Sequence, residues 1–207
     1  MQIYLWATTM LYGPLAWAYD VVAWLVSFGY WSRWRLDALE YLKAGSVLEI
    51  GFGTGGLLAA LVEGGMDVTG LELSPQMHTV TGRKLRKREM NVKRVRGKSE
   101  SLPFHTQSFD NVISTFPSNY ILDQRTMCEV FRVLRGNGRW VVLGFGVTFN
   151  SGIKRWVTDL WMGRAADNLI PALIQKMAAA GFQARRVDHQ SEGYTLPVLI
   201  MEKISEN

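Results

Sequence analysis

The stretch from Val47 to Gly56, with the sequence VLEIGFGTGG, constrains the fold more than any other part of the chain. Its first four residues have the length and the branched apolar content of a buried parallel strand. Glycines follow at positions 51, 53, 55 and 56, and a helical pattern begins at Leu57. Glycines at this spacing allow a tight turn and let a ligand lie against bare main chain, at the positive end of the next helix. The stretch therefore predicts a strand, a turn and a helix around a polar or anionic ligand.

The glycine turn alone fits two classes of cofactor site. Gly51, Gly53 and Gly56 match the G-x-G-x-x-G fingerprint of dinucleotide sites, in which an acid about 20 residues further on binds the ribose. Glu72 stands at that position. Glu49 favours the other class, because it lies inside the strand, where a buried carboxylate needs a cationic partner. The ammonium and sulfonium groups of S-adenosylmethionine would supply such a partner.

Helical and extended patterns alternate regularly after the turn. The chain predicts helices over 57–63, 74–89 and 169–180, a further helix near Trp156 and Trp161, and strands over 47–50, 67–73, 92–96, 109–114, 140–145, 182–187 and 196–204. Such alternation implies right-handed crossovers and a mostly parallel sheet. Ligands of these sheets bind outside the carboxyl ends of the strands. Glu72, at the end of the second strand, is therefore expected beside the glycine turn.

Four motifs, in order, resemble those of class I S-adenosylmethionine-dependent methyltransferases. EIGFGTG at 49–55 is similar to the E-x-G-x-G-x-G motif of that family, and GKSESLPF at 97–104 to its G-D-A-E-x-L-P-F motif. FDNV at 109–112 is similar to F-D-x-V, and EVFRVLRGNGR at 129–139 to E-x-x-R-V-L-K-P-G-G-R. The resemblance, which is to methyltransferase types 11 and 25, implies S-adenosylmethionine as the cofactor. It also implies a Rossmann-like, doubly wound α/β fold whose seven-stranded sheet is mostly parallel, with the last strand antiparallel.

The resemblance also implies which residues contact the cofactor. These are Glu49, Gly51, Phe52, Gly53, Gly55, Glu72, Leu73, Ser99, Glu100 and Thr115, with Glu72 binding the ribose. The sequence departs from the family at Lys98, where an aspartate usually accepts from the adenine amino group. A lysine cannot accept a hydrogen bond, so we expect Ser99 to contact the adenine instead.

Methyl transfer from a sulfonium is an in-line displacement, which requires the protein mainly to align the two reactants and exclude water. The loop TFPSNY at 115–120 would face the methyl group. It differs from the N-P-P-Y sequence of enzymes that methylate amino groups of nucleic acids, which disfavours that substrate class. Tyr12, Tyr19, Asp20 and Tyr120 are candidates for the acceptor side, the tyrosines through their aromatic faces and Asp20 as a proton acceptor. For each of them a packing role is the alternative.

Residues 1–44 are expected to form an aromatic helical extension of a methyltransferase domain over 45–207. Five of the eight tryptophans lie in the first 34 residues, and Asp20 is the one charge between Ile3 and Trp31. A helix from Pro14 to Trp31 would carry Trp17, Val21, Trp24, Phe28 and Trp31 on one face, and a second helix would follow over 34–42. This segment is interpreted as a lid over the pocket, as an interfacial membrane helix flanked by Arg33 and Arg35, or as a membrane span, which Gly13-Pro14 and Asp20 disfavour.

The composition limits the remaining possibilities. With Cys128 as the one cysteine no internal disulfide forms, and the three scattered histidines lack metal-ligand spacing, so no metal is predicted. Nine of the 23 lysines and arginines lie within 83–98. This stretch is either a solvated helix and edge strand, or a patch for an anionic membrane or nucleic acid. Because no aromatic residues alternate with these cations, nucleic acid is the weaker partner.

These observations predict a methyltransferase that acts on an apolar small-molecule or lipid-like acceptor, in the cytoplasm or at a membrane surface. The aromatic N-terminus and Tyr19-Asp20 resemble the quinone and phospholipid methyltransferase branch. An NAD(P)-dependent reductase on the same glycine turn and a non-catalytic cofactor-binding module stay open as alternatives. The sequence indicates no particular oligomeric state.

Overall fold

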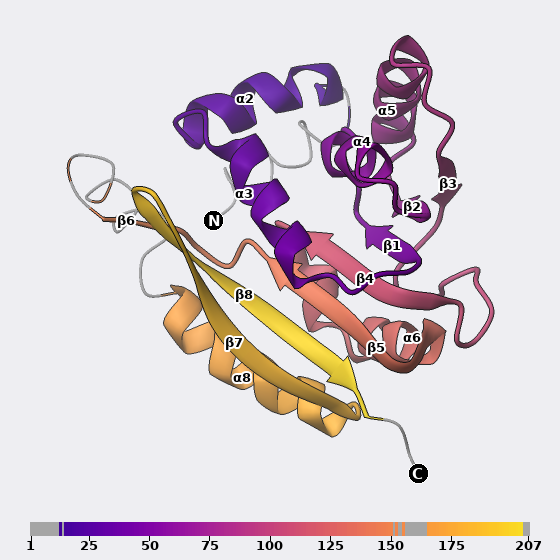
Figure 1. Cartoon of the computed structure of the whole chain (residues 1–207), viewed down its shortest axis with the longest axis vertical. Helices are drawn as coiled ribbons and strands as arrows, with labels where there is room; N and C mark the ends of the chain where they lie inside the picture. Colours follow the sequence, from indigo (N-terminus) through magenta and orange to yellow (C-terminus); the bar gives the residue numbers. More distant parts are fainter. Residues whose placement is uncertain (1–12, 14, 151, 153–154, 156–164, 205–207) are drawn as a thin grey trace.

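A mixed sheet lies at the centre of the protein (Figure 1). The computed structural model describes residues 13, 15–150, 152, 155 and 165–204. In the described part the strands are β1 (Val47–Ile50), β2 (Val68–Glu72), β3 (Lys93–Arg96), β4 (Phe109–Thr115), β5 (Leu134–Leu143), β6 (Thr148–Phe149), β7 (Phe182–Ser191) and β8 (Tyr194–Lys203). Their order is β3-β2-β1-β4-β5-β8-β6, with β7 also paired to β8. Strands β1 to β5 are parallel and β8 is antiparallel to β5, which confirms the predicted Rossmann-like fold.

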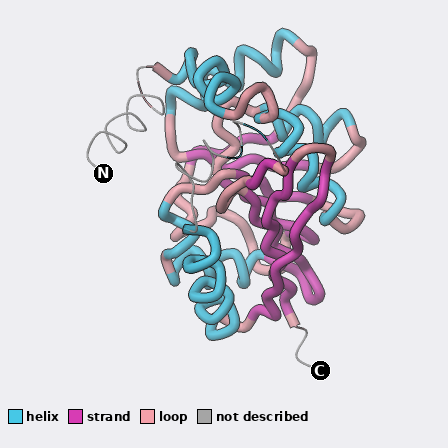
Figure 2. Tube along the Cα trace, turned by 90° about the vertical axis from the view of Figure 1, so that its left-hand side faces the viewer, coloured by secondary structure: helices cyan, strands magenta, loops and turns pink. Residues whose placement is uncertain are grey.

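Alternate side chains of the strands enter two separate cores, one on each face of the sheet. Val47 and Ile113 belong to one core, and their neighbours Leu48 and Val112 belong to the other, as the twofold period of a strand requires. Helices α4 (Gly56–Glu63) and α5 (Pro75–Lys87) contribute to the first core, and α6 (Gln124–Val133) and α8 (Ala165–Ala179) to the second. Figure 2 shows helices on both sides of the central strands. The sheet is therefore doubly wound.

The N-terminal segment forms two helices rather than the predicted single helix from Pro14 to Trp31. The 3-10 turn η1 (Ala16–Ala18) leads into α2 (Tyr19–Val26), and after a break come α3 (Trp31–Asp37) and a second 3-10 turn, η2 (Ala38–Tyr41). Phe28 and Gly29 have φ angles of 52° and 83°, which end the first helix. The Ser27 hydroxyl accepts the N–H of Trp31 at 3.0 Å and so helps to begin the second helix. The predicted start of the second helix at residue 34 was wrong, because the break at Phe28 and Gly29 lets that helix begin at Trp31.

Two features of the sheet also differ from the prediction. Strand β5 begins at Leu134 rather than at residue 140, because Leu134 pairs with Phe109 before the register shifts and Arg139 pairs with Asn111. The short strand β6 (Thr148–Phe149) pairs with β8 and brings the described sheet to eight strands instead of seven. The helix predicted near Trp156 and Trp161 lies outside the described residues, as do residues 1–12 and Pro14.

The end of the N-terminal segment packs on the sheet. Trp34 and Ala38 are buried in the same core as strands β1, β5 and β8. The Tyr194 hydroxyl of β8 donates to the Asp37 carboxylate at 2.5 Å. The predicted boundary between residues 44 and 45 stays a prediction. In the part of the chain that the structure describes, every helix is too short or too polar to cross a membrane.

Candidate active site

The glycine turn leaves β1 at its carboxyl end and contacts two neighbouring elements. The Gly51 N–H donates to the Leu71 carbonyl of β2 at 2.7 Å, with Gly51 at a φ of 78°. A Cβ atom on Gly51 would stand 3.2 Å from the Tyr120 hydroxyl, so a larger residue would crowd the loop after β4. Gly55 packs more tightly still, because a Cβ there would lie 2.4 Å from Cγ2 of Thr81. Glycine is required at both positions by close approach as well as by backbone angle.

Glu72, the last residue of β2, is held beside this turn. Its carboxylate accepts the N–H of Gly53 at 3.0 Å and the N–H of Ser74 at 2.8 Å. Each carboxylate oxygen keeps a further lone pair for a hydroxyl donor. The side chain is therefore oriented before any ligand arrives.

A cavity of about 790 Å³ opens in front of Glu72, where the carboxyl ends of β1, β2 and β4 meet. A volume of this size is typical of cofactor and small-ligand sites. Seven of the residues predicted from the sequence line it: Gly51, Glu72, Leu73, Ser99, Glu100, Thr115 and Tyr120. Lys98 lies in the same wall, beside Ser99. The structure thus brings together the sequence motifs that follow β1, β2, β3 and β4.

Glu49 belongs to β1 but is not among the residues that line this cavity, and its carboxyl group is buried. Only 1% of its surface is exposed, and its Oε2 atom has no hydrogen-bond partner among the described residues. Burial raises the pKa of Glu49 to about 8, the nearby Arg35 guanidinium opposes this rise, and the Glu72 carboxylate adds to it. A buried carboxyl oxygen without a hydrogen-bond partner fits a ligand that brings a positive charge, such as the ammonium group of S-adenosylmethionine.

The loop after β4 is fixed from both sides. The Tyr120 hydroxyl donates to the Ile50 carbonyl at 2.9 Å, and the Phe116 N–H donates to the Leu143 carbonyl at 2.7 Å. The Phe116 ring stacks on Trp31 of α3, with centroids 4.1 Å apart and planes 30° apart. Sequence reasoning missed this contact, because Trp31 was placed on a helix face with Trp17 and not opposite the loop.

The segment after β3 is held by the last of the four motifs. Glu129 accepts the N–H of Leu102 at 2.7 Å. Arg132 donates to the carbonyls of Leu102 and Phe104 at 3.0 and 2.8 Å. The Ser99 hydroxyl accepts from the Thr126 hydroxyl at 3.0 Å. Helix α6 therefore fixes the part of the cavity wall to which Ser99 belongs. The spacing of the two motifs in the sequence did not indicate this contact.

The remaining predicted residues lie elsewhere. Phe52 is buried, and its ring packs edge-on against the His78 ring of α5, with centroids 4.9 Å apart. It therefore supports the turn by packing in the core. Gly53 and Gly55 belong to the turn but not to the lining of this cavity. The Tyr19 ring meets Trp31 edge-on, with centroids 6.1 Å apart. Tyr12 lies outside the described residues.

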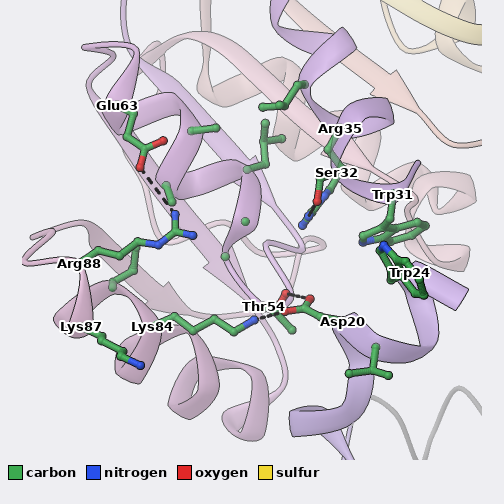
Figure 3. Close-up of a pocket in the computed structure, with 18 residues that line it drawn as sticks. Asp20, Trp24, Trp31, Ser32, Arg35, Thr54, Glu63, Lys84, Lys87 and Arg88 are labelled. Carbon is green, nitrogen blue, oxygen red and sulfur yellow. Dashed lines mark hydrogen bonds and ion pairs between the residues drawn. The ribbon is translucent and has the colours of Figure 1, made fainter. Parts of the chain in front are cut away.

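Asp20 lines a second cavity, of about 730 Å³, which reaches the turn at Thr54–Gly56 rather than at Gly51. Its carboxylate accepts from the Thr54 hydroxyl at 2.6 Å and forms an ion pair with Lys84 of α5 (Figure 3). These contacts hold the pKa of Asp20 below its usual value against the opposing effect of burial. The structure therefore separates Asp20 from Tyr120. Among the described residues no group of three or more His, Cys, Asp or Glu side chains is placed to hold a metal ion.

Comparison with known proteins identifies the family of this chain. A family model described as a methyltransferase domain matches residues 47–138. A demethylmenaquinone methyltransferase from Thermus thermophilus is 33% identical over 206 residues, which covers 84% of this chain and 92% of that protein. The ubiquinone/menaquinone biosynthesis C-methyltransferase UbiE from Syntrophotalea carbinolica is 32% identical over 149 residues, covering 69% and 63% of the two chains.

Solved structures share the fold. Geranyl diphosphate C-methyltransferase from Streptomyces coelicolor, solved with S-adenosyl-L-homocysteine, superposes with a TM-score of 0.63 at 16% identity, over 84% of this chain and 79% of that one. The family match decides between the two cofactor classes that the glycine turn leaves open, in favour of S-adenosylmethionine and of an enzyme. The chain belongs to the class I S-adenosylmethionine-dependent methyltransferases.

Proposed function

We propose that the protein transfers a methyl group from S-adenosylmethionine to a lipid-like acceptor of the quinone type. The observation that carries the proposal is the similarity, over most of both chains, to a protein named demethylmenaquinone methyltransferase. The aromatic and apolar side chains of Phe116, Pro117 and Tyr120 in the wall of the 790 Å³ cavity support it, because a flat apolar ring packs well on such a surface.

The cofactor would be held by residues that the fold has already oriented. Glu72 would accept from the ribose hydroxyls, Glu49 would receive the ammonium group, and Ser99 and Glu100 would lie along the adenine side. S-adenosylmethionine supplies an electrophilic methyl group. The protein's own contribution would be to hold the acceptor in line with the methyl–sulfur bond and to keep water out.

The acceptor would lie against the loop 115–120. Of the candidates for the acceptor side, Tyr120 lines the cavity, and its hydroxyl is engaged by the Ile50 carbonyl. We therefore infer that Tyr120 is a fixed wall for the acceptor ring and not a mobile acid. Asp20 is engaged by Lys84 and Thr54, so the role that we propose for it is to hold α2 in place.

A quinone with an isoprenoid tail partitions into lipid. An enzyme with such an acceptor works where the cytoplasm meets a membrane, and we propose this location for the protein. The acceptor is proposed by its chemical class: a flat oxygenated ring with an apolar tail.

Methyl transfer from isotope-labelled S-adenosylmethionine tests the proposal. The purified protein is incubated in detergent micelles with demethylmenaquinone, in its oxidised and reduced forms, and separately with water-soluble phenols and amines. We expect label in the lipid fraction of the first mixture and only background in the second. Label that enters the soluble acceptors alone would contradict the proposed acceptor and leave the methyltransferase assignment untouched.

The stack of Trp31 on Phe116 provides a second test. We expect Trp31→Ala to lower turnover about a hundredfold, since a displacement of roughly 1 Å in a positioning contact has an effect of that order. Affinity for S-adenosylhomocysteine should change less than about threefold, because the residues assigned to the cofactor do not depend on this ring. Trp31→Phe keeps an aromatic face and should recover most of the turnover. Equal loss in both variants would show that the stack does not position the loop.

A further inference from the structure

Helix α2 is oriented with its large apolar side chains outward. The buried residues are small: Ala16 of η1, Ala23 of α2 and Ser27 at the end of α2 are at most 5% exposed. By contrast, Trp17 of η1 is 73% exposed and Trp24 of α2 is 59% exposed. A helix that packs as a lid would bury its large residues, because they gain most from leaving water. The outward face, which we term the α2 face, consists of Trp17, Val21, Trp24 and Leu25.

Specific polar contacts fix this orientation. Asp20, on the flank of α2, bonds to Thr54 of the glycine turn and to Lys84 of α5. The Ser27 hydroxyl donates to the Trp24 carbonyl at 3.2 Å and accepts the N–H of Trp31. Turning the α2 face toward the sheet would break the bonds of Asp20 and leave its carboxylate without its partners. The contacts of Asp20 therefore keep the tryptophans on the surface of the protein.

Cations lie across the second cavity from part of the α2 face. Val21 and Trp24 line the 730 Å³ cavity together with Arg35 of α3 and with Lys84, Lys87 and Arg88 at the end of α5. Figure 3 shows Trp24 and Trp31 across the cavity from Arg88. The two acids of this lining are each paired, Asp20 with Lys84 and Glu63 with Arg88 at 3.6 Å. The lining of this cavity therefore combines apolar side chains with more cations than acids.

We propose that the α2 face and the adjacent cations of α5 dock on an anionic lipid bilayer. Tryptophan prefers the depth of lipid headgroups, where its ring is apolar and its N–H stays wet, and lysine and arginine attract phosphate at the same depth. Charge complementarity favours a bilayer over a second copy of this chain. Two copies joined by this face would bring their basic clusters together, and the net charge of +5 would repel.

The inference deepens the proposed function by naming the surface that contacts the membrane. The docking proposal rests on the proposed function, because a lipid-like acceptor is what would bring the protein to a membrane. Docking itself can be measured without any acceptor. The two proposals can therefore fail separately, one in a methyl-transfer assay and the other in a binding assay.

Co-sedimentation of the full chain with vesicles tests the docking surface. The vesicles contain phosphatidylcholine, with or without phosphatidylglycerol. We expect binding to the anionic vesicles that weakens as salt is added, because the attraction between exposed cations and lipid phosphates is screened. The double variant Trp17→Ser/Trp24→Ser should bind more than tenfold more weakly, and Lys87→Gln/Arg88→Gln about thirtyfold more weakly, at about 1 kcal/mol for each cation.

Matched controls change the same chemistry at the other end of the molecule. Ile204→Ser removes an exposed apolar side chain after β8, and Lys176→Gln removes an exposed cation of α8. Both should bind vesicles as the parent protein does, and all variants should bind S-adenosylhomocysteine normally, which shows that they are folded. Equal binding by the Trp17/Trp24 variant and the parent would overturn the proposal. So would a dimer, seen by analytical ultracentrifugation, that this variant abolishes.

Discussion

Glu72→Ala is expected to weaken binding of S-adenosylhomocysteine tenfold or more. The substitution removes the carboxylate that would accept both ribose hydroxyls, and lost hydrogen bonds to a charged group correspond to roughly 1.5 to 3 kcal/mol. It also frees the N–H groups of Gly53 and Ser74, which now bond to Glu72, and so loosens the turn. Isothermal titration calorimetry measures the change directly.

A control for this variant is available in the same region of the chain. Glu63→Ala removes an exposed acid at the end of α4, whose Arg88 partner is 3.6 Å away at the surface. This change should leave the affinity as it is, because exposed ion pairs contribute little. If a folded Glu72→Ala protein binds S-adenosylhomocysteine as tightly as the parent, then Glu72 does not hold the ribose.

Glu49→Gln is expected to make the protein more stable at high pH and to weaken its cofactor binding at the same time. The pKa of Glu49 is about 8 in the folded protein, against an ordinary value of 4.5. Its contribution to stability is therefore complete below about pH 4.5, and it is lost as the pH rises to about 8, where the buried group ionises. Glutamine never ionises, so the melting temperature of the variant should exceed that of the parent at pH 9 but match it closely at pH 5.

The same group gives cofactor binding a pH dependence of opposite sign. An ammonium ligand pairs with the ionised carboxylate, so the affinity of the parent for S-adenosylmethionine should rise as the pH approaches 8. In Glu49→Gln the affinity should be lower, and the rise through this pH range should be absent. A variant that binds the cofactor with the parent's pH profile would show that the ammonium group does not pair with Glu49.

The core of the site could be predicted from the sequence because it depends on local patterns. The branched apolar run before Gly51 fixes β1, and the alternation that follows places β2 next to it. Glu72 then reaches the turn because it is the last residue of a parallel neighbour. Seven of the predicted residues line one cavity for this reason.

The N-terminal segment could not be predicted in the same way, because its conformation depends on contacts distant in the sequence. Asp20 meets Lys84, 64 residues away, and Trp31 meets Phe116 of the β4 loop. Helical periodicity placed Trp17 and Trp31 on one face, but the break at Phe28 and Gly29 sends them to different surroundings. The spacing of the tryptophans does not indicate that the first helix ends before Ser27 and that the chain then changes direction.

A crystal structure of the protein with S-adenosylhomocysteine tests the central claim most directly. We predict the ligand in the 790 Å³ cavity, with its ribose hydroxyls on Glu72, its ammonium group on Glu49 and its sulfur toward the loop 115–120. The second cavity, beside Asp20 and Thr54, should hold no cofactor. A complex in which the ligand occupies that second cavity, or in which neither Glu72 nor Glu49 contacts it, would contradict the account.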